Sequence, residues 1–446
     1  MKRALVLGVF FALMASLTLV ANAGKKAGVI DYKEYELDNG LRVILSVDKS
    51  VPIVAVNVWY HVGSGYEEEG RSGFAHLFEH MMFQGSENVD KREHSNFVQR
   101  AGGNNNGSTT QDRTNYYEVM PANRLNLALW LEADRMRSLA ITEENFENQR
   151  EVVKEERRQR VDNQPYGAAF LTSDTLSYNF KPYRHTVIGK MVDLDAATVA
   201  DVQAFFDNYY SPNNAVLVVV GDIDYKKTMK MVEEYFGDIP RGADVEPLTG
   251  VETPHDGERR KIIEDANANV PAVFAAFTIP NSLHEDMAAL ELLGKILTDG
   301  ESSRMYKRLV KEEEAAVVVF GGVDVRKGPG LFRFITASNV GVDIEKCESL
   351  MFEEIEKVKT EGISAAELEK AKVQFKSDFI TGRQTVLNKA EEIQRYVYFN
   401  RDLAEINTDI ESYMAVTQED IIRVANTYLI EKNRTVVIAV PASKEG

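Results

Sequence analysis

The chain has 446 residues, which is too long for one ordinary hydrophobic core and fits two large domains. With 44% hydrophobic and 27% charged residues, it has the composition of a soluble globular protein. The formal net charge of −17 argues against nucleic acid or an anionic membrane as the main partner, because both require a basic protein surface.

The N-terminal stretch has the pattern of an export signal. Lys2 and Arg3 form a short basic start, an apolar run follows, and ANA at residues 21–23 offers the small residues that a signal peptidase needs. The alternative is a membrane anchor, although the run is near the short end for a spanning helix. We predict a signal peptide over residues 1–23, a periplasmic location and no membrane contact after its removal. Cys347 is the only cysteine, which excludes an internal disulfide.

Beyond the signal, two pairs of stretches repeat at one spacing. Residues 51–60 (VPIVAVNVWY) resemble residues 270–279 (VPAVFAAFTI), and residues 197–220 resemble residues 416–439. The members of both pairs are separated by the same offset along the chain, which indicates two copies of one domain. Each copy is expected to open with a strand and continue with an apolar-faced helix and a long charged helix. It should close with an amphipathic helix and a β-branched strand.

These patterns predict an α+β fold with two homologous domains, each of mixed sheet plus helices. The long charged helices are expected within residues 142–161 and 364–383. We place the domains at residues 28–240 and 259–446. The linker at residues 241–258 is rich in Pro, Gly and acidic residues and lacks periodicity.

The stretch GFAHLFEHMMFQGS, residues 73–86, carries the spacing His-x-x-Glu-His. On a helix, His76 and His80 share one face with Cβ atoms about 5–6 Å apart, so both imidazoles can bind one Zn²⁺. Glu79 borders that face and can reach a metal-bound water without binding the metal, as a catalytic zinc requires. The alternative is a buried helix whose histidines are satisfied by ordinary core hydrogen bonds.

Three stretches together resemble the pitrilysin (insulinase-like) zinc metallopeptidases, which include the β-type subunits of the mitochondrial processing peptidase. They are HLFEHMMFQGS, AGGNNNGSTTQDRTNYYEVMP and NQREVVKEERRQR. The resemblance extends from Gly28 to the C-terminus and includes the inverted zinc motif. It implies a mitochondrial processing peptidase-like metallohydrolase fold, endopeptidase activity and one Zn²⁺ per chain.

By this resemblance, His76 and His80 bind zinc, Glu79 activates water, and a glutamate about 75 residues past the second histidine completes the site. Glu156 stands 76 positions after His80, and we predict it as the third ligand. Glu155 is the alternative.

Helical geometry favours Glu156 over Glu155. Glu156 would share a face with Val152 and Val153, which we expect to point inward, whereas Glu155 is rotated by about 100°. Related sequences often have a second glutamate where this chain has Gln149, and Gln149 can still hydrogen-bond to a metal ligand.

Asn106 is the predicted substrate-binding residue. It matches an asparagine on the family's sheet-edge strand, which pairs with the substrate backbone as an added strand would. The alternative is an ordinary surface hairpin.

The second domain lacks the metal motif. The offset between the two copies carries the three motif residues onto Lys295, Thr298 and Asp299. In the family this domain supplies an arginine and a tyrosine that hold the substrate, but here Lys311 and Val317 stand near those positions. We therefore predict the zinc-bearing subunit of a heterodimer. A homologous partner would supply the arginine and tyrosine, and the two would close as a clamshell around peptide substrates.

Three other functions stay open. A non-catalytic structural subunit would share the fold, although the retained motif argues against it. A lyase of the S-ribosylhomocysteinase type shares the motif but is much shorter and uses a cysteine at its metal. A peptide-binding or chaperone-like module that merely retains zinc is the third.

Overall fold

The computed structural model describes residues 28–248, 250 and 252–442. The signal peptide predicted for residues 1–23 lies outside the described residues. Within the described part, no helix is both long and apolar enough to cross a bilayer.

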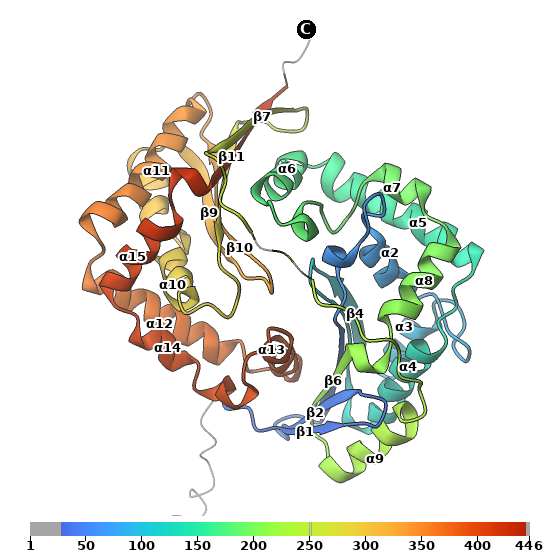
Figure 1. The fold of residues 1–446 in the computed structure, drawn as a ribbon. Coiled ribbons are helices and arrows are strands. Elements are labelled where there is room, and N and C mark those ends of the chain that lie inside the picture. The colour runs from blue at the N-terminus through green and yellow to red at the C-terminus, as the bar shows by residue number, and fades with distance from the viewer. Residues whose placement is uncertain (1–27, 249, 251, 443–446) are drawn as a thin grey trace, which may run out of the picture.

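Two mixed sheets form the framework, one in each half (Figure 1). The first has the order β1-β2-β6-β3-β5-β4 and the second β7-β11-β8-β10-β9. The pairs β2–β6 and β11–β7 are parallel, and all other pairs are antiparallel. The predicted α+β class with mixed sheets is therefore confirmed. The strands are β1 (Lys33–Glu36), β2 (Arg42–Val47), β3 (Ile53–Tyr60), β4 (Asn104–Thr109), β5 (Thr114–Pro121), β6 (Ala215–Gly221), β7 (Arg259–Asp265), β8 (Ala272–Ile279), β9 (Ala316–Asp324), β10 (Gly330–Ser338) and β11 (Arg434–Pro441).

Helices cover both faces of each sheet (Figure 1). The helices before the linker are α2 (Phe74–Met81), α3 (Glu93–Arg100), α4 (Leu125–Arg137), α5 (Glu143–Arg157), α6 (Gly167–Ser177), α7 (Met191–Ala196), α8 (Val199–Tyr209) and α9 (Tyr225–Phe236). Those after it are α10 (Met287–Thr298), α11 (Ile344–Glu361), α12 (Ala365–Thr381), α13 (Val386–Tyr398), α14 (Ile410–Ala415) and α15 (Gln418–Tyr428). The long charged helices expected within residues 142–161 and 364–383 are α5 and α12.

The duplication is visible element by element. The offset found in the sequence carries β3 onto β8 and α8 onto α15, end for end. Thr198 and Thr417, which begin α8 and α15, each form the same reciprocal capping box three residues into the helix. The predicted domain boundaries at residues 28–240 and 259–446 remain a prediction.

Each half lends one helix to the sheet of the other half. Helix α6 packs on β8 and β11, and its counterpart α13 packs on β3 and β6 (Figure 1). Strand β6 is buried along its whole length: Leu217 and Val219 face the helices of the first half, whereas Val216, Val218 and Val220 pack under α13. A strand that is apolar on both faces needs cover on both, and the exchanged helix supplies it.

Gln394 fastens α13 to the first sheet. Its fully buried Nε2 donates to the backbone carbonyl of Asn57 at 3.0 Å and to that of Val216 at 2.8 Å. We expect Gln394→Ala to lower the free energy of unfolding by about 2–3 kcal/mol, because two buried carbonyls lose a donor and a cavity remains.

Unfolding by guanidinium, followed by the fluorescence of Trp59 and Trp130, measures this effect on the first half, where both tryptophans lie. The control is Arg395→Ala, at the next position of α13 but 55% exposed. It should change the free energy of unfolding by less than about 0.5 kcal/mol. Equal effects of the two variants would contradict the role of Gln394.

Candidate metal centre

Helix α2 carries the His-x-x-Glu-His motif and buries its opposite face. Five of its residues are buried in the core of the first half: Phe74, Ala75, Leu77, Phe78 and Met81. This burial fixes the rotation of the helix, so His76 and His80 emerge on the face that meets α5.

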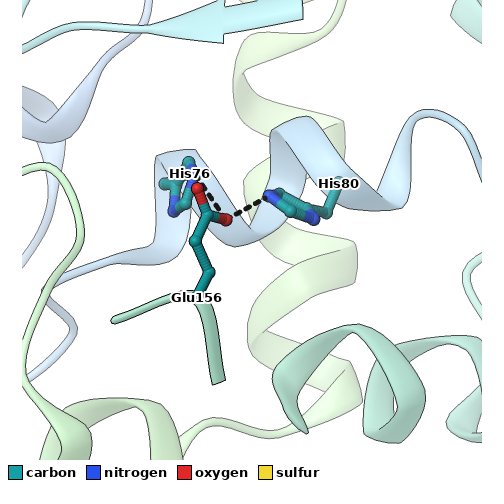
Figure 2. Close-up of side chains that lie close together, drawn as sticks. All are labelled: His76, His80 and Glu156. Carbon is teal, nitrogen blue, oxygen red and sulfur yellow. Dashed lines mark ion pairs between the residues drawn. The ribbon is translucent and has the colours of Figure 1, made fainter. Parts of the chain in front are cut away.

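Glu156 reaches the two histidines from the last turn of α5. Its Oε2 lies 3.2 Å from His80 Nε2 and 3.6 Å from His76 Nε2. Figure 2 shows the two imidazoles on one helix and the carboxylate between them, extending from a second chain segment. One ligand atom from each residue lies within 4.8 Å of the others. The structure thus brings together the three predicted metal ligands.

The alternative ligand Glu155 points away from this cluster. Its side chain is 52% exposed and pairs with Arg158 at 3.0 Å, whereas that of Glu156 is 16% exposed. One detail of the helical argument is wrong, because Val153 is buried but Val152 is 42% exposed. The buried residues of α5 include those at positions 146, 149 and 153, and Val152 is rotated by about 100° from its neighbour Val153.

The electrostatics of the cluster favour a bound cation. Burial, together with the neighbouring His80, lowers the pKa of His76 to about 4, so this imidazole is neutral near pH 7. A hydrogen bond from His80, together with electrostatic attraction from neighbouring groups that include Arg160, lowers the pKa of Glu156. Arg160 Nη1 contacts the other carboxylate oxygen of Glu156 at 2.7 Å. A neutral imidazole and a carboxylate therefore direct lone pairs at a shared point.

Glu79 lies beside the cluster without belonging to it. Its Oε2 accepts a hydrogen bond from Thr109 Oγ1 at 2.6 Å, which links α2 to strand β4. Burial raises the pKa of Glu79, and the Thr109 hydrogen bond offsets part of this effect. A carboxylate with a raised pKa is a stronger proton acceptor than an exposed one.

A cavity of about 740 Å³ opens over these residues. Asn106, on the edge strand β4, is exposed at its rim, and its Oδ1 accepts from the backbone N–H of Gly107. Strand β4 pairs with β5 on one side only, so its other edge is available to an added strand. Gln149 also lines the cavity and donates to Asn148 Oδ1 at 2.8 Å. The roles predicted for Asn106 and Gln149 remain predictions.

Two contacting residues were missed by sequence reasoning. Thr109 stands 30 residues after Glu79, and only the pairing of β4 with the sheet brings its hydroxyl to that carboxylate. Arg160 lies one helical turn past Glu156, so the i,i+4 spacing is the signal that could have found it.

In the second half, an ion pair occupies the matching place. Lys295 Nζ, from α10, lies 3.0 Å from Asp299 and 2.6 Å from Asp378 of α12. The ammonium joins the two helices that correspond to α2 and α5. Lys311 is 58% exposed and lies 3.7 Å from Glu301, and Val317 is 53% exposed on the edge strand β9.

Comparisons with known proteins identify the family of the chain. The description "Insulinase (Peptidase family M16)" matches residues 42–190, and "Peptidase M16 inactive domain" matches residues 196–375. The zinc protease PqqE of Helicobacter pylori is 31% identical over 95% of this chain and 96% of its own length. The chain belongs to peptidase family M16.

Solved structures share the fold of this M16 chain. A crystal structure of a protease from Helicobacter pylori superposes with a TM-score of 0.88 at 31% identity, over 93% of this chain and 100% of that one. The periplasmic protease PqqL from Escherichia coli has a TM-score of 0.77 at 18% identity. The match covers 93% of this chain and 48% of PqqL, and it shows the fold alone.

The donor set of this M16 chain fits a catalytic Zn²⁺. Two imidazole nitrogens and one carboxylate oxygen are the ligands of a known class of zinc peptidase sites, which leave a fourth position for substrate or water. The buried Nδ1 of His76 has no hydrogen-bond partner among the described residues. A second cluster of His94, Glu118 and Glu132 does not fit, because Arg135 contacts both carboxylates and its positive charge opposes a cation there.

Proposed function

We propose that this chain is a zinc-dependent endopeptidase that cleaves peptides or unfolded segments, with one Zn²⁺ bound by His76, His80 and Glu156. The convergence of these three side chains within 4.8 Å carries the proposal. Glu79 on the same helix supports hydrolysis, since a metal-binding role alone does not require a buried carboxylate there.

The residues of the site divide the reaction among them. The edge of β4, with Asn106, holds the substrate as an added strand, through main-chain hydrogen bonds that demand little of its sequence. When bound, zinc supplies a Lewis acid that polarises the scissile carbonyl and activates water. Glu79 accepts the proton of the attacking water at its carboxylate and returns it to the leaving amine. Thr109 holds Oε2 of that carboxylate in place.

We further propose that the chain works with a homologous subunit that closes on it as a clamshell. Neither Lys311 nor Val317 offers a planar guanidinium or a phenol that could hold the substrate carbonyl. Both side chains are more than half exposed, and Lys311 is 3.7 Å from Glu301. The match of residues 196–375 to a domain described as inactive supports a second half that has no metal site of its own.

A periplasmic location belongs to the same proposal. The apolar N-terminal run and the small residues at positions 21–23 support export. The similarity in fold to a protease described as periplasmic is consistent with it.

Cleavage of a quenched fluorescent peptide tests the function. The purified chain alone should show a low kcat/KM, and a homologous subunit that carries the arginine and tyrosine should raise it by at least about 100-fold, the usual loss when one oxyanion donor is missing. Removal of metal by a chelator should abolish cleavage by the pair, and added Zn²⁺ should restore it. Full activity of the chain alone would refute the proposal that it needs a partner subunit. A zinc-loaded pair that binds peptides without cleaving them would favour a peptide-binding subunit.

A further inference from the structure

The metal helix α2 begins without a side-chain cap of its own. Its N-cap residue is Gly73, at a φ of 93°, and glycine has no side chain to accept the free N–H groups of the first turn. The Glu67 carboxylate accepts them from the preceding loop: Ala75 N–H donates at 2.8 Å and Gly73 N–H at 2.9 Å. Its negative charge also complements the positive end of the helix dipole.

His185 holds Glu67 from the other side. Its Nε2 lies 3.0 Å from Glu67 Oε2 and 2.6 Å from the backbone carbonyl oxygen of Ser64, and the Glu67 side chain is 0% exposed. Burial acts to lower the pKa of His185, but the Glu67 carboxylate and the hydrogen bond to the Ser64 carbonyl outweigh it and raise the pKa above its usual value. Each oxygen of the buried carboxylate therefore has a partner: one receives Ala75 N–H, and the other receives Gly73 N–H and also lies 3.0 Å from the His185 ring.

The loop that follows His185 contacts both metal-bearing helices. Residues 186–188 line the cavity beside the metal ligands. Gly189 packs so closely on the start of α2 that a Cβ atom on it would lie 2.5 Å from the Gly73 Cα. Arg157, the residue after Glu156, donates to the Gly189 carbonyl at the end of α5. One loop therefore contacts the two helices that carry all three candidate ligands.

We propose that Glu67 is a positioning residue for the metal centre. Its carboxylate holds the backbone of the first turn of α2 through Gly73 and Ala75, and thereby orients His76, which directly follows Ala75. His185 in turn holds both Glu67 and the loop of residues 186–188 that lines the cavity. This inference rests on the proposed function, because it requires His76 to bind zinc.

The main test is the zinc affinity of the metal-free full chain carrying Glu67→Gln. The amide keeps the size of the carboxylate but offers one oxygen, so one backbone N–H of the first turn loses its acceptor. Affinity, measured by competition with a chromophoric chelator, should fall by about tenfold, the low end for residues that act through a metal ligand. The visible absorption bands of the Co²⁺-substituted chain should shift. Glu68→Gln, at the exposed neighbouring position, is the control and should change neither.

Changes at His185 provide a second test, which stands even if Glu67→Gln fails to fold. His185→Ala should weaken zinc binding in the same direction, because the buried carboxylate loses one partner. His185→Gln keeps an N–H donor and should restore most of the affinity. Unchanged affinity and an unchanged Co²⁺ spectrum in Glu67→Gln and His185→Ala, with only a loss of thermal stability, would overturn the proposal.

The outcome also separates this inference from the proposed function. A wild-type chain that binds zinc but cleaves nothing with any homologous subunit would refute the peptidase and leave the affinity test of Glu67 valid. A wild-type chain with no zinc affinity would overturn both.

Discussion

Replacement of Glu79 by glutamine should lower kcat by about 10²–10⁴-fold, the usual contribution of a general base, and leave zinc bound. The amide has nearly the same shape and can still accept from Thr109 Oγ1, but it cannot take a proton. Cleavage of a quenched fluorescent peptide by the assembled pair gives kcat. Metal analysis of the same preparation gives the zinc content, and fluorescence anisotropy gives peptide affinity.

Glu87→Gln is the matched control, since Glu87 is an exposed glutamate shortly after the motif. It should leave kcat unchanged. A Glu79→Gln chain that turns over at nearly the wild-type rate would refute the assignment of the base. A variant that also loses its zinc would make Glu79 a ligand instead.

The second large effect is expected at Glu156. Glu156→Gln should weaken zinc binding by more than about 100-fold, because the loss of a ligand exceeds the loss of a group that only orients one. It should also leave Arg160 without its carboxylate partner, which adds an uncompensated positive charge near the ligands. Competition with a chromophoric chelator measures the affinity directly and does not require activity.

Glu155→Gln is the control for this experiment, because the two residues are adjacent and carry the same charge. Glu155 contacts Arg158 and faces solvent, so its replacement should change zinc affinity by less than about twofold, as for an exposed ion pair. If Glu155→Gln instead loses zinc and Glu156→Gln retains it, the ligand assignment is reversed.

Helical periodicity predicted much of the candidate site. The i,i+4 spacing places His76 and His80 on one face of any helix, and the structure has them there. Glu156 followed from a family spacing combined with periodicity. The same periodicity was wrong about Val152, because the sequence does not say which line of residues on α5 meets α2.

Contacts between distant segments could not be predicted in this way. Thr109 reaches Glu79 through the sheet, and Glu67 reaches the start of α2 through a loop. The spacing between the residues of each pair does not follow the periodicity of a helix or a strand. The internal repeat predicted two similar halves, but the sequence pattern of an amphipathic helix does not indicate which of the two sheets the helix packs on. The exchange of α6 and α13 therefore appears only in three dimensions.

That exchange has a consequence for how the chain can be divided. An N-terminal fragment that ends at the linker would lack α13, so the apolar face of β3 and β6 would be exposed. It would contain α6 but not β8 and β11, the strands on which α6 packs. We therefore expect that neither half folds stably on its own. If a protease cut the chain between residues 241 and 258, we expect the two fragments to remain bound through the exchanged helices, as the two subunits of a domain-swapped dimer do.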